Sequence, residues 1–323
     1  MRIGVVGGGA WGTALAQLAA AGDEAVLLWA REAEVVASVN NARENALFLP
    51  GVALSPAVRA TPSLGELAEC DALLLVTPAQ HLRAVLAEAP PAPVLLLCAK
   101  GIEAGSFKLM SEVAAEVQCA ATVAVLSGPT FAAEVARGLP TAATLACADG
   151  RVREQLVARL SQPSFRLYGS DDVTGAEIGG AVKNVLAIAC GVAEGLGLGS
   201  NARAALIARG FAEMTRYGLA RGARADTLAG LSGLGDLVLT CSSTQSRNFS
   251  LGVGLGEGRD LRALLGGRTI AEGAATAPVL QASARAVEVD MPLVDAVCAL
   301  LEGERAAAVT ARLLDRPLVS RET

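Results

Sequence analysis

The chain has 323 residues, of which 52% are hydrophobic and only 18% are charged. This length is enough for two domains with a buried core in each, and the composition excludes an intrinsically disordered or a fibrous chain. A net charge of −5 and an aromatic content of 3% also exclude a surface built to bind nucleic acid.

The N-terminal segment is the stretch whose length suggests a membrane span or a secretory signal. Residues 3–22 carry no charge and follow Met1 and Arg2. However, glycines at positions 7, 8, 9 and 12 would break a hydrophobic helix in the middle of this stretch. We therefore expect neither a signal peptide nor stable membrane insertion.

Cysteine and histidine usage bears on compartment and on metal binding. The seven cysteines are scattered without a Cys-x-x-Cys pair, and His81 is the single histidine. Such a pattern indicates buried, reduced thiols in a cytoplasmic protein, and it predicts no metal site. His81 follows Thr77-Pro78 and is expected in a loop.

Short apolar runs alternate with helical stretches through the first half of the chain, which is typical of a parallel sheet covered by helices. The runs predict strands at 2–6, 24–29, 72–76, 94–98, 122–126 and 142–146, with a helix over 11–21 after the first of them. Their near-continuous Val, Leu and Ala content predicts strands buried on both faces. We therefore expect an α/β domain with a doubly wound sheet over residues 1–179.

The pattern of apolar residues in the sequence changes after about residue 175. The runs 181–193, 202–220 and 277–288 have apolar residues at helical spacing and few clusters of β-branched residues. They predict an all-helical C-terminal domain over residues 180–323. No Gly/Ser-rich or Pro-rich linker marks the boundary between the two domains.

A glycine motif, Gly7-x-Gly9-x-x-Gly12, lies between the first predicted strand and the first predicted helix. In a dinucleotide-binding turn, these three glycines allow a tight turn, close approach of the backbone to a pyrophosphate, and close packing of helix on strand. The N–H groups and the dipole of the helix then attract the anion. This placement predicts a Rossmann-type domain that binds NAD(P); the alternative is a glycine turn with only a structural role.

The end of the second predicted strand bears on which dinucleotide is bound. An acidic side chain at this point is typical of proteins restricted to NAD, because it binds the ribose hydroxyls. Here the position holds Arg31, whose guanidinium suits a 2′-phosphate, and Glu32 follows immediately. We expect NADP(H) to be used, with NAD(H) as a second or alternative cofactor.

Lysine occurs at only three positions, Lys100, Lys108 and Lys183. Unlike arginine, lysine loses its proton readily on burial, so these are the positions at which acid–base chemistry is expected. Lys100 follows a buried strand, at the sheet edge that faces ligands, whereas Lys108 is expected at the surface. Lys183 lies in an apolar helix, where it either extends its nitrogen to solvent or has a function.

A small, polar run in the second domain has residue types that hold a phosphate ester. Gly235-Asp236 leads to Ser246-Arg247-Asn248, in which the arginine offers a forked set of donors to phosphate oxygens. Asp236 is expected either as a helix cap or as the partner of a buried lysine. The alternative for the whole run is an ordinary polar loop.

Taken in order, these motifs closely resemble those of the bacterial NAD(P)-dependent glycerol-3-phosphate dehydrogenases over almost the whole chain. The lysine–asparagine helix followed by Ser-Arg-Asn is far more specific than the glycine turn. The segments that carry the resemblance are Gly7–Ala16, Leu28–Arg31, Asn45–Gly51, Lys100–Glu103, Ser127–Ala132, Glu177–Asn184, Gly233–Asp236, Thr240-Cys241, Ser246–Asn248 and Glu272-Gly273.

The resemblance implies reversible, NAD(P)H-dependent reduction of dihydroxyacetone phosphate to sn-glycerol 3-phosphate, a precursor of phospholipids. The substrate is thus a small molecule, and the enzyme is expected to form a homodimer. Lys183 is then the proton acceptor in the oxidation direction. The implied substrate contacts are Lys100, Gly128, Thr130, Lys183, Asp236, Ser246, Arg247 and Asn248. With the glycine motif, the implied cofactor contacts are Gly7, Gly9, Ala10, Trp11, Gly12, Arg31, Lys100, Ala132, Arg247, Ile270 and Glu272. Ala10 and Phe48 depart from the family pattern, in which serine and tyrosine are frequent at these positions.

The implied chemistry is physically coherent, because negative charge grows on the carbonyl oxygen as hydride is transferred. Protonated Lys183 would stabilise this oxygen and then donate its proton. Burial is expected to lower the pKa of Lys183, and a nearby Asp236 to oppose that shift. Two alternatives stay open: a hydroxyacyl-CoA or 2-ketoacid reductase, which usually relies on a histidine or a differently placed lysine, and a non-catalytic nucleotide sensor.

Overall fold

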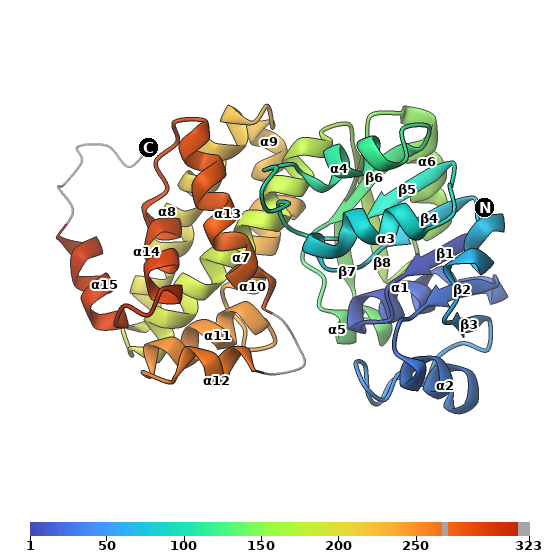
Figure 1. Cartoon of the computed structure of the whole chain (residues 1–323), viewed down its shortest axis with the longest axis horizontal. Helices are drawn as coiled ribbons and strands as arrows, with labels where there is room; N and C mark the ends of the chain where they lie inside the picture. Colours follow the sequence, from blue (N-terminus) through green and yellow to red (C-terminus); the bar gives the residue numbers. More distant parts are fainter. Residues whose placement is uncertain (267–270, 316–323) are drawn as a thin grey trace. The chain divides into compact units, whose positions relative to one another are not determined.

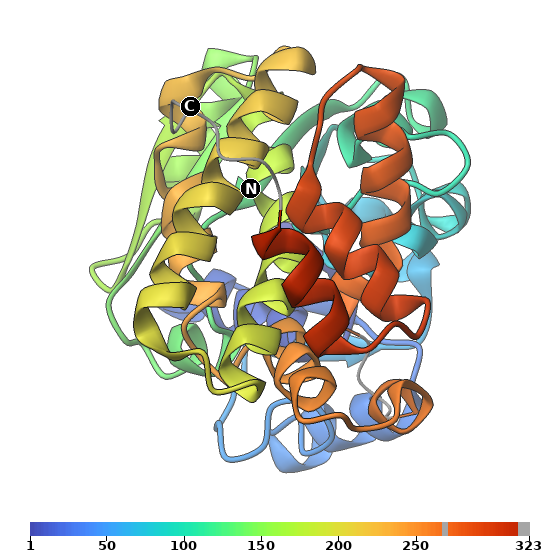
Figure 2. The ribbon, with the colours of Figure 1, turned by 90° about the vertical axis from the view of Figure 1, so that its left-hand side faces the viewer.

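The structure is a computed structural model, and it describes residues 1–266 and 271–315. The chain forms two compact units. The first comprises Met1–Lys100 and Lys108–Ala176, and the second comprises Gly101–Phe107 and the chain from Glu177 onward. The eight strands that the described residues form all belong to the first unit (Figure 1), and the second is built from helices (Figure 2).

The first unit is built on one sheet with the order β3-β2-β1-β4-β5-β6-β7-β8. Because β1 pairs with β2 on one side and with β4 on the other, the chain changes direction of winding there, and ligands of such sheets bind at this point. The strands are β1 (Ile3–Val6), β2 (Val26–Trp29), β3 (Val58–Thr61), β4 (Ala72–Leu75), β5 (Val94–Leu97), β6 (Thr122–Ser127), β7 (Thr141–Cys147) and β8 (Phe165–Ser170). The predicted doubly wound sheet with a helical C-terminal domain is thereby confirmed.

The predicted parallel sheet has one exception, at β7. This strand runs antiparallel to β6, with Ser127 opposite Thr144, whereas β7 and β8 are parallel to each other. The connection gives the physical reason. A parallel crossover must return the chain to the other end of the sheet, usually by a helix, but α5 (Ala132–Ala136) has only 5 residues and is too short to span the sheet. The chain therefore turns back at the carboxyl end of β6, and β7 begins there.

The two strands that the sequence analysis missed, β3 and β8, form the two edges of the sheet. Both carry exposed polar or aromatic residues within the strand, namely Arg59 in β3 and Arg166 and Tyr168 in β8. Edge strands are covered less completely than central ones. Their polar residues interrupt the continuous apolar runs that identified the central strands.

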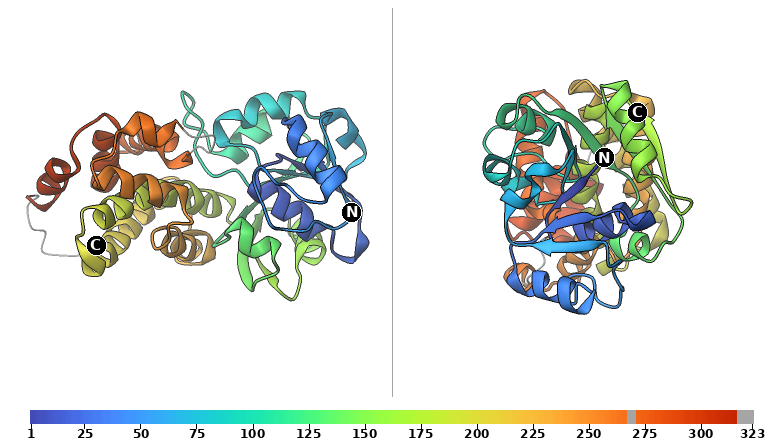
Figure 3. Two further views of the ribbon diagram at one scale, coloured as in Figure 1. Left: turned by 90° about the horizontal axis from the view of Figure 1, so that it is seen from below. Right: turned by 90° about the vertical axis from the view of Figure 1, so that its right-hand side faces the viewer.

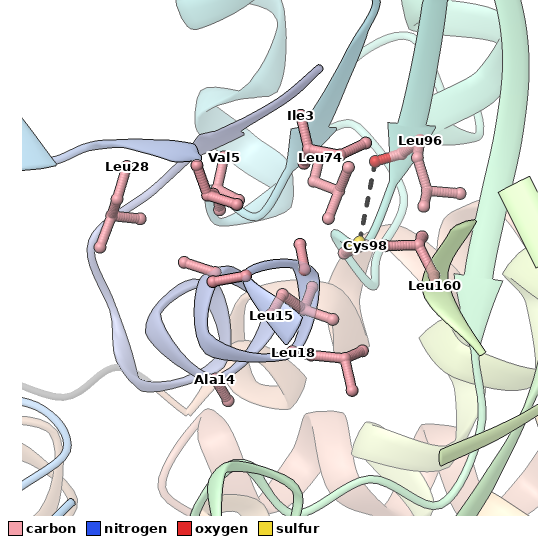
Figure 4. Close-up of a cluster of buried hydrophobic side chains, with 14 of the residues drawn as sticks. Ile3, Val5, Ala14, Leu15, Leu18, Leu28, Leu74, Leu96, Cys98 and Leu160 are labelled. Atoms are coloured by element: carbon pink, nitrogen blue, oxygen red, sulfur yellow. Dashed lines mark hydrogen bonds between the residues drawn. The ribbon is translucent and has the colours of Figure 1, made fainter. Parts of the chain in front are cut away.

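Helices cover both faces of the sheet, as Figure 3 shows from two directions. Alternate side chains of each central strand point to opposite faces, so Val5 and Leu74 join one apolar cluster while Val6 and Leu75 join another. In the first cluster, Leu15 of α1 packs beneath the central strands (Figure 4). The helices of this unit are α1 (Ala10–Ala19), α2 (Ala33–Ala42), α3 (Leu82–Glu88), α4 (Met110–Val117), α5 and α6 (Gly150–Leu160).

The named elements among the described residues of the second unit are all helices. One of its helices, α7, is long and apolar enough to cross a membrane, but 94% of its most apolar window is buried inside the protein, as in the core helix of a soluble protein. α13 packs on α14, which in turn packs on α8 and α15. The helices are α7 (Val173–Gly195), α8 (Gly199–Ala220), α9 (Ala225–Leu228), α10 (Asp236–Thr240), α11 (Arg247–Gly256), α12 (Leu261–Leu265), α13 (Glu272–Ala286), α14 (Pro292–Leu301) and α15 (Ala306–Leu314).

The predicted domain boundary after residue 179 differs from the observed division in two respects. The units separate after Ala176, inside α7, and the segment Gly101–Phe107 belongs to the second unit although it precedes α4 of the first. Arg221 of α8 donates a hydrogen bond to the carbonyl oxygen of Phe107 at 3.4 Å. Such a contact joins residues far apart in the sequence, and no local pattern indicates it.

Glu213 is a buried acidic residue of α8 whose side chain contacts the start of α14. Only 3% of its surface is exposed, and its carboxylate oxygens accept hydrogen bonds from the Leu293 N–H at 3.0 and 3.2 Å. Burial raises the pKa of the Glu213 carboxyl to about 7, although the Leu293 N–H and the nearby Arg216 guanidinium act in the opposite direction. The folded protein therefore holds this proton at a pH at which an unfolded chain has released it.

We expect Glu213→Gln to make the stability of the protein less dependent on pH. In the wild type the free energy of unfolding falls as the pH rises from about 4.5 to about 7, because the unfolded state loses the proton first. The linkage relation gives a loss of about 2 to 3 kcal/mol between pH 5 and pH 8. Urea unfolding at these two pH values measures it. The exposed Glu257→Gln serves as control and should keep the wild-type slope; the same slope in Glu213→Gln would contradict the prediction.

Candidate active site

The glycine turn that the sequence predicts to bind a dinucleotide connects β1 to α1. Gly7 has a φ of +130°, and a Cβ there would lie 2.9 Å from the Val76 carbonyl oxygen. A Cβ on Gly12 would lie 1.8 Å from the Gly7 carbonyl oxygen, whereas none of the described residues lies within 4 Å of the Cβ position of Gly9. The turn therefore needs Gly7 and Gly12 for its own packing, and the space at Gly9 leaves the backbone open to a ligand.

The N-terminus of α1 suits an anion. The helix begins at Ala10, its first turn holds no acidic residue, and among the residues described no side chain caps it. The N–H groups of such an end carry partial positive charge, which favours a pyrophosphate. Asn45 braces the turn, because its Nδ2 donates to the Gly8 carbonyl oxygen at 2.8 Å and to Thr13 Oγ1 at 2.7 Å. Sequence reasoning treated Asn45 only as part of a motif, since a loop asparagine gives no sign of its distant partners.

Arg31 lies two residues after the end of β2, the strand that pairs with β1. It therefore stands at the carboxyl edge of the sheet, next to the strand that carries the glycine turn. Its guanidinium is 80% exposed and lies 3.2 Å from the Glu32 carboxylate. Because a surface ion pair of this kind is weak, Arg31 can exchange Glu32 for a 2′-phosphate at little cost.

Lys100, Gly128 and Thr130 come together at the ends of β5 and β6. Both Lys100 Nζ and Thr130 Oγ1 donate hydrogen bonds to the Gly128 carbonyl oxygen, each at 3.3 Å. A Cβ on Gly128 would lie 2.9 Å from the Ala143 Cα, so β7 leaves room for glycine alone at this point. α5 begins immediately afterwards at Ala132. These four predicted contacts therefore share the carboxyl edge at which ligands of doubly wound sheets bind.

In the second unit, the ammonium group of Lys183 forms a buried pair with the carboxylate of Asp236. Lys183 is 7% exposed and Asp236 is 0% exposed. Lys183 Nζ donates to Asp236 Oδ1 at 2.5 Å and to Thr240 Oγ1 at 3.0 Å. Of the two roles that the sequence left open for Asp236, the structure supports pairing with a buried lysine. A buried ammonium group held in this way can stabilise a developing oxyanion and donate a proton to it.

Close packing against α7 brings Asp236 to Lys183. Gly179 lies one helical turn before Lys183, and a Cβ there would lie 2.3 Å from the Ser232 carbonyl oxygen. Ser232 belongs to the π-helical segment Leu231–Gly235, which leads directly into α10 and Asp236. The missing side chain of Gly179 therefore lets this segment lie directly on α7. π-Helical turns occur frequently at functional sites.

The start of α11 holds the predicted phosphate-binding residues Ser246 and Arg247. Ser246 is the N-cap, and its Oγ accepts a hydrogen bond from the Phe249 N–H at 3.2 Å. Arg247 is the first residue of the helix and is exposed. A helix N-terminus that carries an exposed guanidinium suits a phosphate group. Since Ser246 already accepts the capping bond, its hydroxyl would serve a phosphate as a donor.

Asn248 ties three helices together. Its Nδ2 donates to Asn184 Oδ1 at 3.0 Å, and its Oδ1 accepts from the Gly273 N–H at 2.9 Å. Asn184 follows Lys183 in α7, and Gly273 follows Glu272, the first residue of α13. Both polar ends of the Asn248 side chain are thus engaged within the protein. The predicted cofactor contact Ile270 lies outside the described residues.

Glycines hold α7 and α11 at close distance. A Cβ on Gly191 would lie 2.1 Å from the Phe249 carbonyl oxygen, and a Cβ on Gly252 would lie 2.1 Å from the Ile188 carbonyl oxygen. Gly195 and Gly256 repeat this arrangement four residues further along each helix. Small residues at such spacing let two helix backbones approach closely. The start of α11 is thereby positioned beside the segment of α7 that carries Lys183 and Asn184.

Thr240 contacts the Lys183–Asp236 pair, a position that sequence reasoning did not assign to it although it quoted Thr240 within a motif. It lies one turn after Asp236 in α10, and its hydroxyl donates to Asp236 Oδ1 at 3.3 Å. The four-residue spacing on one helix face is the signal that would have indicated it. Cys241 lies beside this group, but a hydrogen bond with Cys190 and burial raise the pKa of its thiol well above the ordinary value. The raised pKa favours the neutral thiol, which is a poor nucleophile.

Comparison with known proteins identifies the family. The model for the NAD-dependent glycerol-3-phosphate dehydrogenase N-terminus matches residues 2–153, and the model for its C-terminus matches residues 172–311. The glycerol-3-phosphate dehydrogenase (NAD(P)+) of Erythrobacter litoralis is 61% identical over 319 residues, which cover 98% of this chain and 97% of the relative. That of Novosphingobium aromaticivorans is 61% identical over 323 residues, which cover 99% and 98%. The crystal structure of glycerol-3-phosphate dehydrogenase from Coxiella burnetii matches with a TM-score of 0.93 at 37% identity, covering 98% of this chain and 99% of that one.

The chain belongs to the NAD-dependent glycerol-3-phosphate dehydrogenase family. It is an oxidoreductase that uses NAD or NADP, as the motifs implied. Family membership sets aside the two alternatives, a hydroxyacyl-CoA or 2-ketoacid reductase and a non-catalytic nucleotide sensor.

The first unit of this glycerol-3-phosphate dehydrogenase fits the cofactor that the family uses. Three of its buried polar atoms, Trp11 Nε1, Thr77 Oγ1 and Ser127 Oγ, have no hydrogen-bond partner within the described part of the chain. Buried polar groups are nearly always partnered in folded proteins. Such atoms are therefore expected where a ligand provides the partner. Together with the open backbone at Gly9, they fit a dinucleotide at the carboxyl edge of the sheet.

Proposed function

We propose that this dehydrogenase reduces dihydroxyacetone phosphate with Lys183 as the acid and oxidises sn-glycerol 3-phosphate with Lys183 as the base. The observation that carries the proposal is the buried ammonium group of Lys183, 2.5 Å from Asp236 Oδ1. A positive charge excluded from water stabilises the developing oxyanion more strongly than a solvated one. The bound nicotinamide supplies or accepts the hydride.

Asp236 and Thr240 position the reacting nitrogen. Their oxygens hold Lys183 Nζ at 2.5 and 3.0 Å, so the ammonium group keeps one place while its proton is transferred. A buried charge without a partner is strongly destabilising, and pairing with Asp236 reduces this penalty. A hydrogen bond between the side chains of Asn248 and Asn184 joins α11 to the same segment of α7. The lysine therefore meets the carbonyl oxygen in a preorganised site.

The substrate phosphate is assigned to the start of α11. Arg247 provides a forked pair of charge-assisted donors, and the helix N-terminus adds partial positive charge. Lys100, Gly128 and Thr130 form the second set of proposed substrate contacts. The proposed cofactor contacts are the glycine turn (Gly7, Gly9 and Gly12), Ala10, Trp11, Arg31, Lys100, Ala132, Arg247 and Glu272.

In the cell, this reaction would provide the glycerol phosphate backbone of phospholipids, in the cytoplasm and by a homodimer. Activity is measured directly by oxidation of NADPH at 340 nm with dihydroxyacetone phosphate. The cellular role is tested by depleting the enzyme in its host, in medium without glycerol. We expect growth and phospholipid synthesis to stop, and to resume with the wild-type gene or with added glycerol 3-phosphate. Undiminished phospholipid synthesis after depletion would contradict the proposed role.

A further inference from the structure

The hydroxyl of Thr77 is a buried polar group with no assigned function. Only 6% of Thr77 is exposed, and its Oγ1 has no hydrogen-bond partner in residues 1–266 and 271–315. A hydroxyl that loses water on folding and gains no partner destabilises the folded state. An apolar side chain of the same shape, such as valine, would avoid this cost. The threonine is therefore unexplained by the folding of the chain alone.

Thr77 lies against the glycine turn. It follows β4 by two residues, and the Cβ position of Gly7 is 2.9 Å from the Val76 carbonyl oxygen and 3.3 Å from the Thr77 nitrogen. Since β4 lies between β1 and β5, Thr77 stands at the carboxyl edge between the glycine turn and Lys100. A dinucleotide with its pyrophosphate at the turn must cross the end of β4 to bring its nicotinamide toward Lys100.

The local sequence restricts the backbone and the side-chain rotamer of Thr77, and thereby the directions that its hydroxyl can take. Pro78 restricts the backbone of the preceding residue to the extended region. Threonine is branched at Cβ and therefore has few side-chain rotamers. A hydroxyl held in this way can donate a hydrogen bond to a phosphate oxygen or accept one from a ribose hydroxyl with little loss of entropy.

We propose that Thr77 is a cofactor-binding residue whose hydroxyl hydrogen-bonds to an oxygen of the ribosyl-pyrophosphate part of NAD(P). The proposal rests on the assignment of the cofactor to the glycine turn. Ser127 and Trp11 share the unpartnered state, but Ser127 lies two strands away at the end of β6, and Trp11 is already a proposed cofactor contact. The assignment adds a side-chain contact just after β4 to the proposed cofactor contacts that follow β1 and β2.

The test compares Thr77→Val with Thr13→Val in the full-length enzyme. Both threonines are buried, but Thr13 Oγ1 accepts a hydrogen bond from Asn45 Nδ2 at 2.7 Å. Thermal unfolding without ligand and the dissociation constant of NADPH, from its fluorescence, are measured for each. We expect Thr77→Val to keep or raise the unfolding temperature of the free enzyme and to weaken NADPH binding about fivefold to tenfold, the loss of one hydrogen bond. Thr13→Val should lower the unfolding temperature.

The possible outcomes distinguish an error in the assignment of the Thr77 hydroxyl from an error in the assignment of the cofactor site as a whole. Thr77→Ser keeps the hydroxyl and should bind NADPH with nearly the wild-type dissociation constant. Equal affinities of wild type and Thr77→Val would overturn the assignment of Thr77, as would a fall in the unfolding temperature of Thr77→Val that matches Thr13→Val. Failure of the wild-type enzyme to bind NADPH would instead overturn the cofactor site on which the assignment rests.

Discussion

Lys183→Ala is expected to lower kcat for the reduction of dihydroxyacetone phosphate by about a hundredfold or more, the effect of removing an acid–base group. The buried ammonium group of Lys183 is the proposed proton donor, and alanine can neither donate a proton nor stabilise the oxyanion. Steady-state oxidation of NADPH at 340 nm measures kcat. Turnover close to that of the wild type would remove Lys183 from the mechanism.

The experiment must distinguish a loss of catalysis from a loss of folded protein, because Lys183→Ala leaves the Asp236 carboxylate buried without its cation. Circular dichroism and the dissociation constant of NADPH show whether the variant is folded and binds its cofactor. Small primary amines added to Lys183→Ala should restore part of kcat, which a purely structural lysine would not allow. Lys108→Ala is the matched control. Lys108 precedes α4 and forms an ion pair with Glu116 at the surface, and its loss should leave kcat unchanged.

Arg247→Ala is expected to raise KM for dihydroxyacetone phosphate by roughly 10- to 100-fold, the effect of losing charge-assisted hydrogen bonds to a phosphate. The change in kcat should be smaller, since in the proposed role Arg247 would bind the phosphate in the substrate and in the transition state alike. Arg247 is exposed at the first position of α11, so its removal leaves no buried cavity. Initial rates over a range of substrate concentrations give both constants.

A second arginine provides the control for Arg247. Arg259 is exposed just beyond the other end of α11, and Arg259→Ala should keep KM within twofold of the wild type. Arg247→Lys keeps the charge but loses the forked geometry, so its KM should lie between those of the wild type and Arg247→Ala. An unchanged KM in Arg247→Ala would count against the assignment of the phosphate to α11.

The central part of the fold was predictable because its signals are local. Each central strand is covered on both faces and therefore reads as an uninterrupted apolar run. The glycine turn was equally predictable, since the need for Gly7 and Gly12 arises from backbone atoms within the turn and the adjacent strand. The edge strands β3 and β8 were missed because each has a solvent-exposed residue within it. The reversal of β7 was missed because it depends on the short helix α5 in the preceding connection rather than on the strand itself.

Residue types and their spacing were sufficient to recognise the fold class, the dinucleotide turn and the lysine on which the proposed chemistry depends. No local sequence pattern predicted which atoms are in contact. Lys183 and Asp236 are 53 residues apart, and Asn45 reaches Gly8 across 37 residues. Likewise, the Leu293 N–H that donates to the buried Glu213 carboxylate lies 80 residues away in the sequence. Hydrogen bonds and desolvation of this kind depend on how closely the helices pack. The glycines that permit this packing can be identified only in the folded structure, because their neighbours are distant in the sequence.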